Sequence, residues 1–335
     1  MANQLQNEIA VLDATHRLLA AGRSGHGVAH AMDSLVAETS LISLRNLDAW
    51  ERKIRTALQE EEYGSQSHRG RFRRKPTRFA SWLDLCSGDG FKRERILRTL
   101  TGEAPNAFFC SLAFRRLNDW VVQVRVAARE RLPSILERSD PEHVIEALWF
   151  TLAHSASWGR MDDSDRGVFG ALLAKANIAA ALKLRIISAT AGPAASVLSQ
   201  VGRSSALDGS LSEIAGTAIQ PSVRAKAYRY LFEGRMVWVV GRRWVWMDLK
   251  WCKGRFEPVL GERALTERSP FLAVLKMALV DRSPIVRRVG AEFLIKQLNT
   301  LGDDAPAFAR DLATDRSESV AERGRFAMAM LGEQA

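Results

Sequence analysis

The sequence predicts an all-α protein built from stacked helical hairpins, an α-solenoid, with a small β insertion. Residues 119–132 (DWVVQVRVAARERL) and 281–294 (DRSPIVRRVGAEFL) share one pattern, in which an aspartate precedes a valine–arginine pair, a small residue and a leucine. The small residue and the leucine follow the arginine by three and seven positions and therefore lie on one face of a helix. The small residue lets a neighbouring helix approach closely. A hairpin of this size cannot bury its own apolar face, so copies must stack on one another.

Weaker copies of the pattern are centred on Arg93, Arg185 and Arg224, and a last copy carries Ala321 in the arginine position. Where the pattern is clearest, successive copies are about 32 to 34 residues apart, which is typical of helical repeats. The interval from Arg224 to Arg287 is about twice as long, so we expect it to contain an insertion. An atypical final copy is expected of a capping repeat, because one of its sides faces solvent.

The aspartate, valine–arginine, small-residue and leucine positions resemble those of the HEAT-repeat family over roughly residues 80–335. The resemblance implies a right-handed superhelical solenoid. It also implies that Arg125, Arg224 and Arg287 each bridge to an aspartate of a neighbouring repeat. HEAT arrays serve as adaptors, scaffolds and transport receptors and, in one branch, as DNA glycosylases.

Two segments precede the repeats. Residues 1–62 are predicted to form an N-terminal helical cap, with a partner-binding helical arm as the alternative. Residues 63–79 have no apolar periodicity and no acidic side chain, so we expect a flexible basic loop that could neutralise phosphates of a nucleic acid. The alternative is a solvated linker. Together with two arginines outside the repeat position, the candidate anion-binding residues are Arg69, Arg71, Arg73, Arg74, Lys75, Arg78, Arg129 and Arg288.

Residues 235–260 are the most distinctive stretch and hold four of the nine tryptophans. Valine and tryptophan alternate with other residues in two runs, 236–240 and 243–251, which predicts β-strands with turns at Gly241 and Gly254. Residues 256–260 could add a third, edge strand. We therefore predict a two- or three-stranded antiparallel β-meander, which also accounts for the long interval between repeats.

The second predicted strand has an unusual distribution of aromatic residues. Trp244 and Trp246 share one face of it. The opposite face is the expected core side and carries Val245, Met247, Leu249 and Trp251. Burial of one side does not explain the two tryptophans, so they could form an exposed platform that anchors a protein partner or stacks bases, unless both faces are packed. The candidate partner-binding residues are Trp244, Trp246, Arg242, Arg243 and Lys250.

Composition indicates which kind of partner the protein binds and in which cellular compartment it is found. The formal net charge of +10 and the sequence pI of about 9.9 favour an anionic partner, namely nucleic acid, an acidic protein surface or anionic lipid. Cys86, Cys110 and Cys252 are far apart and lack metal-type spacing, which indicates a reducing compartment without disulfides. Neither a signal-peptide pattern nor a membrane-spanning apolar run is recognisable, so we expect a cytoplasmic protein with no membrane partner.

The sequence carries no strong catalytic motif, and we expect no metal ion and no small-molecule cofactor. The expected function is that of a non-enzymatic adaptor or scaffold subunit in a larger complex, with nucleic acid as a further partner. One alternative is a scaffold that binds only an acidic protein. The HEAT resemblance implies a second, a DNA glycosylase that acts on alkylated bases with a carboxylate and aromatic side chains in a basic groove. Its candidate residues are Asp119, Trp120, Trp149, Trp158 and Asp162.

Overall fold

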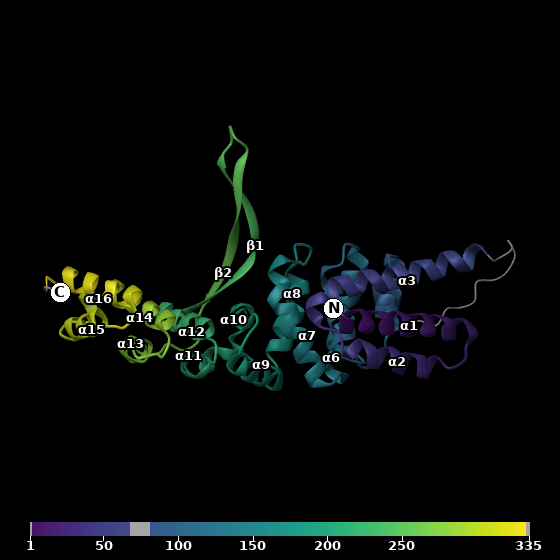
Figure 1. Ribbon diagram of the computed structural model, residues 1–335, viewed down its shortest axis with the longest axis horizontal. Coiled ribbons are helices and arrows are strands. Elements are labelled where there is room, and N and C mark those ends of the chain that lie inside the picture. Colours follow the sequence, from purple (N-terminus) through teal and green to yellow (C-terminus); the bar gives the residue numbers. More distant parts are fainter. Residues whose placement is uncertain (1, 68–80, 333–335) are drawn as a thin grey trace. The chain divides into compact units, whose positions relative to one another are not determined.

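The computed structural model describes residues 2–67 and 81–332, and these residues are mostly helical (Figure 1). They form sixteen α-helices, six short 3-10 helices and one two-stranded antiparallel sheet. The chain divides into two compact units, Met1–Leu172 and Leu173–Ala335, which are described one at a time. The prediction of a helical protein with a small antiparallel β insertion is therefore confirmed.

The described residues of the first unit form α1 (Ala2–Ser24), α2 (Val28–Ser40), α3 (Leu47–Ser67), α4 (Gly90–Thr99), α5 (Ala107–Arg115), α6 (Val122–Arg138), α7 (Pro141–His154) and α8 (Asp163–Leu173). Helix α3 continues through Ser67, past the predicted start of the basic loop at residue 63. Helix α4 packs on α6, and α5 packs on α7. The predicted anion-binding residues of the loop lie outside the described residues; they are Arg69, Arg71, Arg73, Arg74, Lys75 and Arg78.

Helix α5 is the central helix of the first unit. Its sequence AFFCSLAFR has no polar face before the final arginine, as expected of a helix surrounded by others. Every side chain from Ala107 to Phe114 is buried, and the ring of Phe114 stacks on that of Phe169 with centroids 5.5 Å apart. The Asn106 side chain caps the helix by accepting a hydrogen bond from the backbone N–H of Phe109. The C-terminal end of α5 therefore holds Arg115 and its neighbour Arg116 in fixed positions.

The described residues of the second unit form α9 (Ala176–Ser188), α10 (Ala194–Val201), α11 (Leu211–Thr217), α12 (Pro221–Glu233), β1 (Arg235–Asp248), β2 (Lys253–Ala264), α13 (Phe271–Leu279), α14 (Pro284–Lys296), α15 (Asp304–Ala313) and α16 (Glu318–Met330). Successive helices pair as α11 with α12, α13 with α14 and α15 with α16, while α12 packs on α14 and α14 on α16. The small residue of the repeat pattern lets the two helices of a pair approach each other closely. A Cβ added to Gly324 would lie 2.5 Å from the carbonyl carbon of Leu312 in the paired helix.

A buried arginine links one repeat to the next. Arg224 on α12 donates from Nε and Nη2 to the two carboxylate oxygens of Asp281, both at 2.8 Å. Its third nitrogen, Nη1, donates to the carbonyl of Ala218, six residues earlier, at 2.8 Å. The Asp281 carboxylate also accepts from the backbone N–H of Ser283, the residue that caps α14. One guanidinium thus connects the entrance of its own helix to the entrance of the helix that packs on it.

The same arrangement recurs in both units. Arg287 donates to the two oxygens of Asp315 at 2.6 and 2.8 Å, and to the backbone carbonyl of Asp281 at 2.8 Å. In the first unit, Arg93 donates to both oxygens of Asp119 at 2.8 Å and to a carbonyl six residues before itself. The aspartate and arginine of the sequence pattern are therefore the two halves of one recurring contact.

The bridge at Arg125 is the weakest. This arginine keeps its hydrogen bond to the Asp119 carbonyl at 2.9 Å, but its Nε lies 3.6 Å from the nearest oxygen of Asp165. The prediction that Arg125, Arg224 and Arg287 bridge to an aspartate of a neighbouring repeat is confirmed.

The β insertion is one hairpin of two long antiparallel strands. Gly241, predicted to form a turn, lies inside β1, where the register shifts between Val239 and Gly241. The turn is formed by residues 249–252, and the predicted third strand, 256–260, belongs to β2. The three-stranded form and the turns at Gly241 and Gly254 are therefore wrong, since Gly254 pairs with Trp246 inside β2. A glycine within a strand can mark a bulge or a close approach as readily as a turn.

The base of the hairpin is fastened to the helices of its unit. Met236 is buried, and the Tyr230 hydroxyl on α12 donates to the carbonyl of Val237 at 2.7 Å. On the other strand, Arg263 donates to the two oxygens of Asp208 at 2.6 and 2.8 Å. Beyond this base the hairpin projects away from the helices of its unit (Figure 1).

Candidate functional site

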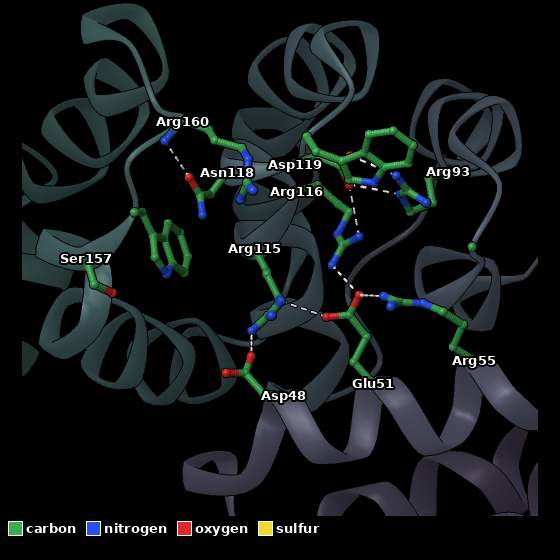
Figure 2. Close-up of a pocket in the computed structure, with 13 residues that line it drawn as sticks. Asp48, Glu51, Arg55, Arg93, Arg115, Arg116, Asn118, Asp119, Ser157 and Arg160 are labelled. Carbon is green, nitrogen blue, oxygen red and sulfur yellow. Dashed lines mark hydrogen bonds and ion pairs between the residues drawn. The ribbon is translucent and has the colours of Figure 1, made fainter.

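A cavity of about 510 Å³ opens in the first unit, beside the C-terminal end of α5 (Figure 2). Helix α3 contributes to one side of it, and the loop that precedes α8 contributes to another. Five arginines and three acids line it, so the charged lining has a formal net charge of +2. These residues, with two tryptophans, are Asp48, Glu51, Arg55, Arg93, Arg115, Arg116, Asp119, Arg160, Trp120 and Trp158.

Most of these charges form one alternating chain of ion pairs (Figure 2). Asp48 pairs with Arg115, whose Nε lies 2.6 Å from Oε2 of Glu51. The other oxygen of Glu51 accepts a hydrogen bond from Arg116 at 2.7 Å. Arg116 then donates to the Asp119 carboxylate at 3.0 Å. This series of ion pairs thus connects α3 to Asp119, an aspartate of the repeat pattern.

Burial and pairing set the protonation of these groups. Burial alone would raise the pKa of Asp119, but hydrogen bonds from Arg93 and the charge of Arg116 hold that pKa below its ordinary value. Burial lowers the pKa of Arg115 to about 10, and the adjacent charge of Arg116 adds to this effect. Asp119 is therefore ionised and Arg115 protonated at neutral pH.

Three of the five glycosylase candidates meet in this cavity, namely Asp119, Trp120 and Trp158. The Asp119 carboxylate accepts hydrogen bonds from two arginines and from the backbone N–H of Val121, so its oxygens are already engaged. Trp149 on α7 is half-buried and does not line the cavity. Asp162 lies outside the lining as well, and its carboxylate accepts from the backbone of Asp165 at the start of α8.

The two indoles of the cavity differ in how they are held. Trp120 is 68% exposed, and the Arg93 guanidinium lies 5.9 Å from its ring centroid. Trp158 is half-buried, and its ring packs at a tilt on Phe169 with centroids 6.5 Å apart. One tryptophan is therefore free to contact a ligand, while the other is part of the wall.

Sequence reasoning missed the residues that make this cavity basic. Arg115 and Arg116 form a visible doublet at the end of an apolar helix, and that doublet was the only signal. Glu51 lies 65 residues from Arg116 in the sequence, so nothing local connects the two. Arg160 lies in a polar loop between two of the glycosylase candidates, Trp158 and Asp162, and carries no motif of its own.

A second candidate surface is the distal part of the hairpin. The strand register pairs Trp244 with Phe256, and Trp246 lies on the same face two residues further along. The Trp244 ring makes edge-type contacts with Phe256 at 4.9 Å and with Trp246 at 5.5 Å between centroids. The exposed fractions of Trp244, Trp246 and Phe256 are 43%, 53% and 63%. These three side chains, here called the aromatic cluster, leave large apolar surfaces open to solvent.

The predicted core side of this strand is not buried. Met247, Leu249 and Trp251 are each about two-thirds exposed or more, and Val245 is half-buried. The assignment of that face to the core is wrong, because the hairpin extends beyond the helices that could cover it. The predicted partner-binding residues are all exposed, namely Trp244, Trp246, Arg242, Arg243 and Lys250.

The two other predicted anion-binding arginines have different surroundings. Arg129 is half-buried and lies 3.2 Å from Asp165 and 3.6 Å from Asp162, so its charge is already paired. Arg288, on the outer face of α14, is exposed as expected.

Among the described residues, no group of three or more histidine, cysteine, aspartate or glutamate side chains is arranged to hold a metal ion. Within residues 2–67 and 81–332, no single helix is both long and apolar enough to cross a membrane. No protein-family model, no curated protein and no solved structure matches this chain.

Proposed function

We propose that this protein is a non-enzymatic adaptor or scaffold whose helical repeats form a right-handed HEAT-like solenoid and whose hairpin binds single-stranded nucleic acid. The observation that carries the proposal is the aromatic cluster. Three large aromatic side chains are held together at the exposed end of a long hairpin, where burial does not account for them. Stacking of a base on an aromatic ring contributes about 1–3 kcal/mol and tolerates any base.

The charges around the cluster favour a polyanion. Between Gly241 and Glu257 the hairpin carries five cations and two acids, a net charge of +3. Arg255 is paired with Glu257 at 2.9 Å, whereas the other cations have no ion pair among the residues that the structure describes. Those exposed cations are Arg242, Arg243, Lys250 and Lys253. Aromatic rings interleaved with cations suit a strand whose bases stack while its phosphates are neutralised.

The absence of enzyme activity is part of the proposal and rests on the cavity in the first unit. The Asp119 carboxylate is bound by Arg93 and Arg116, so it is not free to stabilise a cationic sugar. Incubation with alkylated DNA tests this part directly. Release of a methylated base would establish the glycosylase alternative in place of the adaptor.

The first experiment measures binding of labelled single-stranded RNA and DNA to the full chain by fluorescence anisotropy across a salt series. Replacing Trp244 and Trp246 together by alanine should weaken binding at least about ten-fold and leave the salt slope unchanged, because stacking releases few counterions. The control is Phe91→Ala, which removes an 85%-exposed aromatic side chain from the first unit.

The second arm removes cations instead. Replacing Arg242 and Arg243 by alanine should reduce the slope of log K against log salt by about 1.4, which is about 0.7 per lost phosphate contact on a single strand. The matched control, Arg45→Ala with Arg95→Ala, removes two exposed cations from the first unit and should leave the slope unchanged. No binding of either nucleic acid at low salt would refute the nucleic-acid part and favour an acidic protein as the partner.

A further inference from the structure

One cation of the cavity in the first unit, Arg160, has no counter-charge among the side chains that the structure describes. The Arg160 side chain is exposed, and its guanidinium has no hydrogen bond or ion pair with the side chains of residues 6–61 and 81–332. The backbone of the same residue is fixed, because its N–H donates to Oδ1 of Asn118 at 2.9 Å (Figure 2). The loop therefore fixes the backbone of an unpaired arginine on the cavity wall, and its flexible side chain can reach an anion in the cavity.

A second cation of the cavity, Arg115, has one acidic partner that a bound anion could replace. Arg115 is anchored by Glu51, whose side chain is 3% exposed, at 2.6 Å. Its other partner, Asp48, has a side chain that is 67% exposed. Surface ion pairs of this kind are weak, so an anion that enters the cavity can compete with Asp48 for Arg115.

Aromatic surface lies in the same cavity as these cations. The Trp120 side chain is 68% exposed, and its contact with Arg93 leaves most of its surface open. The volume of about 510 Å³ falls within the range of sites that hold small organic ligands. A ligand that satisfies both features carries a negative charge at one end and a flat ring at the other.

We propose that this cavity binds a nucleoside monophosphate, with the phosphate on Arg160 and Arg115 and the base against Trp120. The phosphate would take the place of Asp48 beside Arg115, while Glu51 would keep that guanidinium oriented. Buried, fully paired charges such as Arg116 would form the floor and would not move. The proposal concerns the first unit and does not depend on nucleic-acid binding by the hairpin.

The test is isothermal titration of the full chain with each of the four 5′-ribonucleoside monophosphates, with the corresponding nucleosides and with inorganic phosphate. We expect saturable binding of at least one monophosphate at micromolar to sub-millimolar concentration. Its nucleoside and inorganic phosphate should each bind at least about ten-fold more weakly, because each lacks one of the two contacts. A tetranucleotide that binds more tightly than the monophosphate would identify a nucleic-acid chain as the source of the ligand. Equal or weaker binding of the tetranucleotide would identify the free nucleotide.

Two variants with opposite expected effects on binding distinguish a change at this site from a general loss of structure. Arg160→Ala should weaken binding at least about ten-fold, since a charged hydrogen bond is lost. Asp48→Asn should tighten binding by up to about five-fold, the upper limit for an exposed ion pair. Arg95→Ala, which removes an exposed cation outside the cavity lining, is the control and should change nothing.

The outcomes are decisive in both directions. The proposal is refuted if no monophosphate binds at millimolar concentration, if Arg160→Ala binds as the unchanged chain does, or if Asp48→Asn weakens binding. The Trp244→Ala, Trp246→Ala variant of the hairpin should bind the monophosphate normally. A failure of hairpin binding and a failure of the cavity proposal are therefore observed separately.

Discussion

Replacing Arg224 by alanine is the most direct test of the arginine–aspartate bridge as the contact that joins repeats. The guanidinium donates two hydrogen bonds to Asp281 and further ones to the carbonyls of Ala218 and Ile219. The two charged side chains are 1% and 6% exposed. After the change, the Asp281 carboxylate would be buried beside only the N–H of Ser283. Removal of one partner from such a pair costs about 3–5 kcal/mol, because an uncompensated charge remains inside the protein.

An exposed arginine–glutamate pair supplies the comparison. Arg98 lies 2.8 Å from Glu130, but the side chains are 43% and 53% exposed. Water screens a pair of this kind, so Arg98→Ala should change the free energy of unfolding by less than about 1 kcal/mol. The contrast between the two arginines isolates the effect of burial from the effect of losing a charge.

The assay is urea unfolding at pH 7, followed by circular dichroism for each variant. We expect a large fall in the midpoint for Arg224→Ala, and a partial recovery when Asp281→Asn is added, because the stranded charge is then removed. If Arg224→Ala costs no more than Arg98→Ala, or if Asp281→Asn adds a further full loss, the bridge is not what joins these repeats.

Three other predictions concern packing, thiols and pH. Gly324→Ala should destabilise the protein by about 3 kcal/mol because its Cβ would meet the backbone of the paired helix, whereas Gly170→Ala, which has open space in α8, should stabilise it by about 0.5–1 kcal/mol; urea midpoints measure both. An alkylating reagent at pH 8 should modify the native protein once, on the exposed Cys252, because burial raises the pKa of the Cys86 and Cys110 thiols. Mass spectrometry counts the adducts, and fast modification of a second thiol would show that Cys86 or Cys110 is not buried. A hydrogen bond from Arg229 lowers the pKa of Glu292 from 4.5 to about 2. The contribution of Glu292 to the free energy of unfolding is therefore present above pH 4.5 and is lost as the pH falls toward 2. When the free energy of unfolding is measured across this pH range, Glu292→Gln should lose less of it than the unchanged protein does.

The repeat contact was predictable because its information is local. An arginine, an aspartate six residues before it and a small residue three after it define one helix and its entrance, so the pattern survives in the sequence. The presence of the hairpin was predictable from the long interval between Arg224 and Arg287 and from the alternating valines and tryptophans within it. Its turn was not, because residues 249–252 (LKWC) contain no glycine or proline, whereas Gly241, the residue expected to mark a turn, lies within β1 where the register shifts.

The cavity depends on information that is not local. Asp119 was recognisable as a repeat residue, but its position between Arg93 and Arg116 arises from packing of three helical segments. Glu51 reaches the cavity from a helix that precedes the repeats. The exposure of both hairpin faces also could not be read from alternation, because alternation states which side chains share a face and not whether anything covers that face.

The bridges between repeats have a consequence for how such a chain can change over time. In the three bridges that use both carboxylate oxygens, the arginine and the aspartate are 26, 28 or 57 residues apart, yet the contact has the same form. The longest interval exceeds the 28-residue one by 29 residues, close to the length of the hairpin. The register between consecutive helices is therefore set by a pair of side chains and not by the length of the connection. Each such connection is a place where a new element can be gained, exchanged or lost while the helices on either side keep their packing.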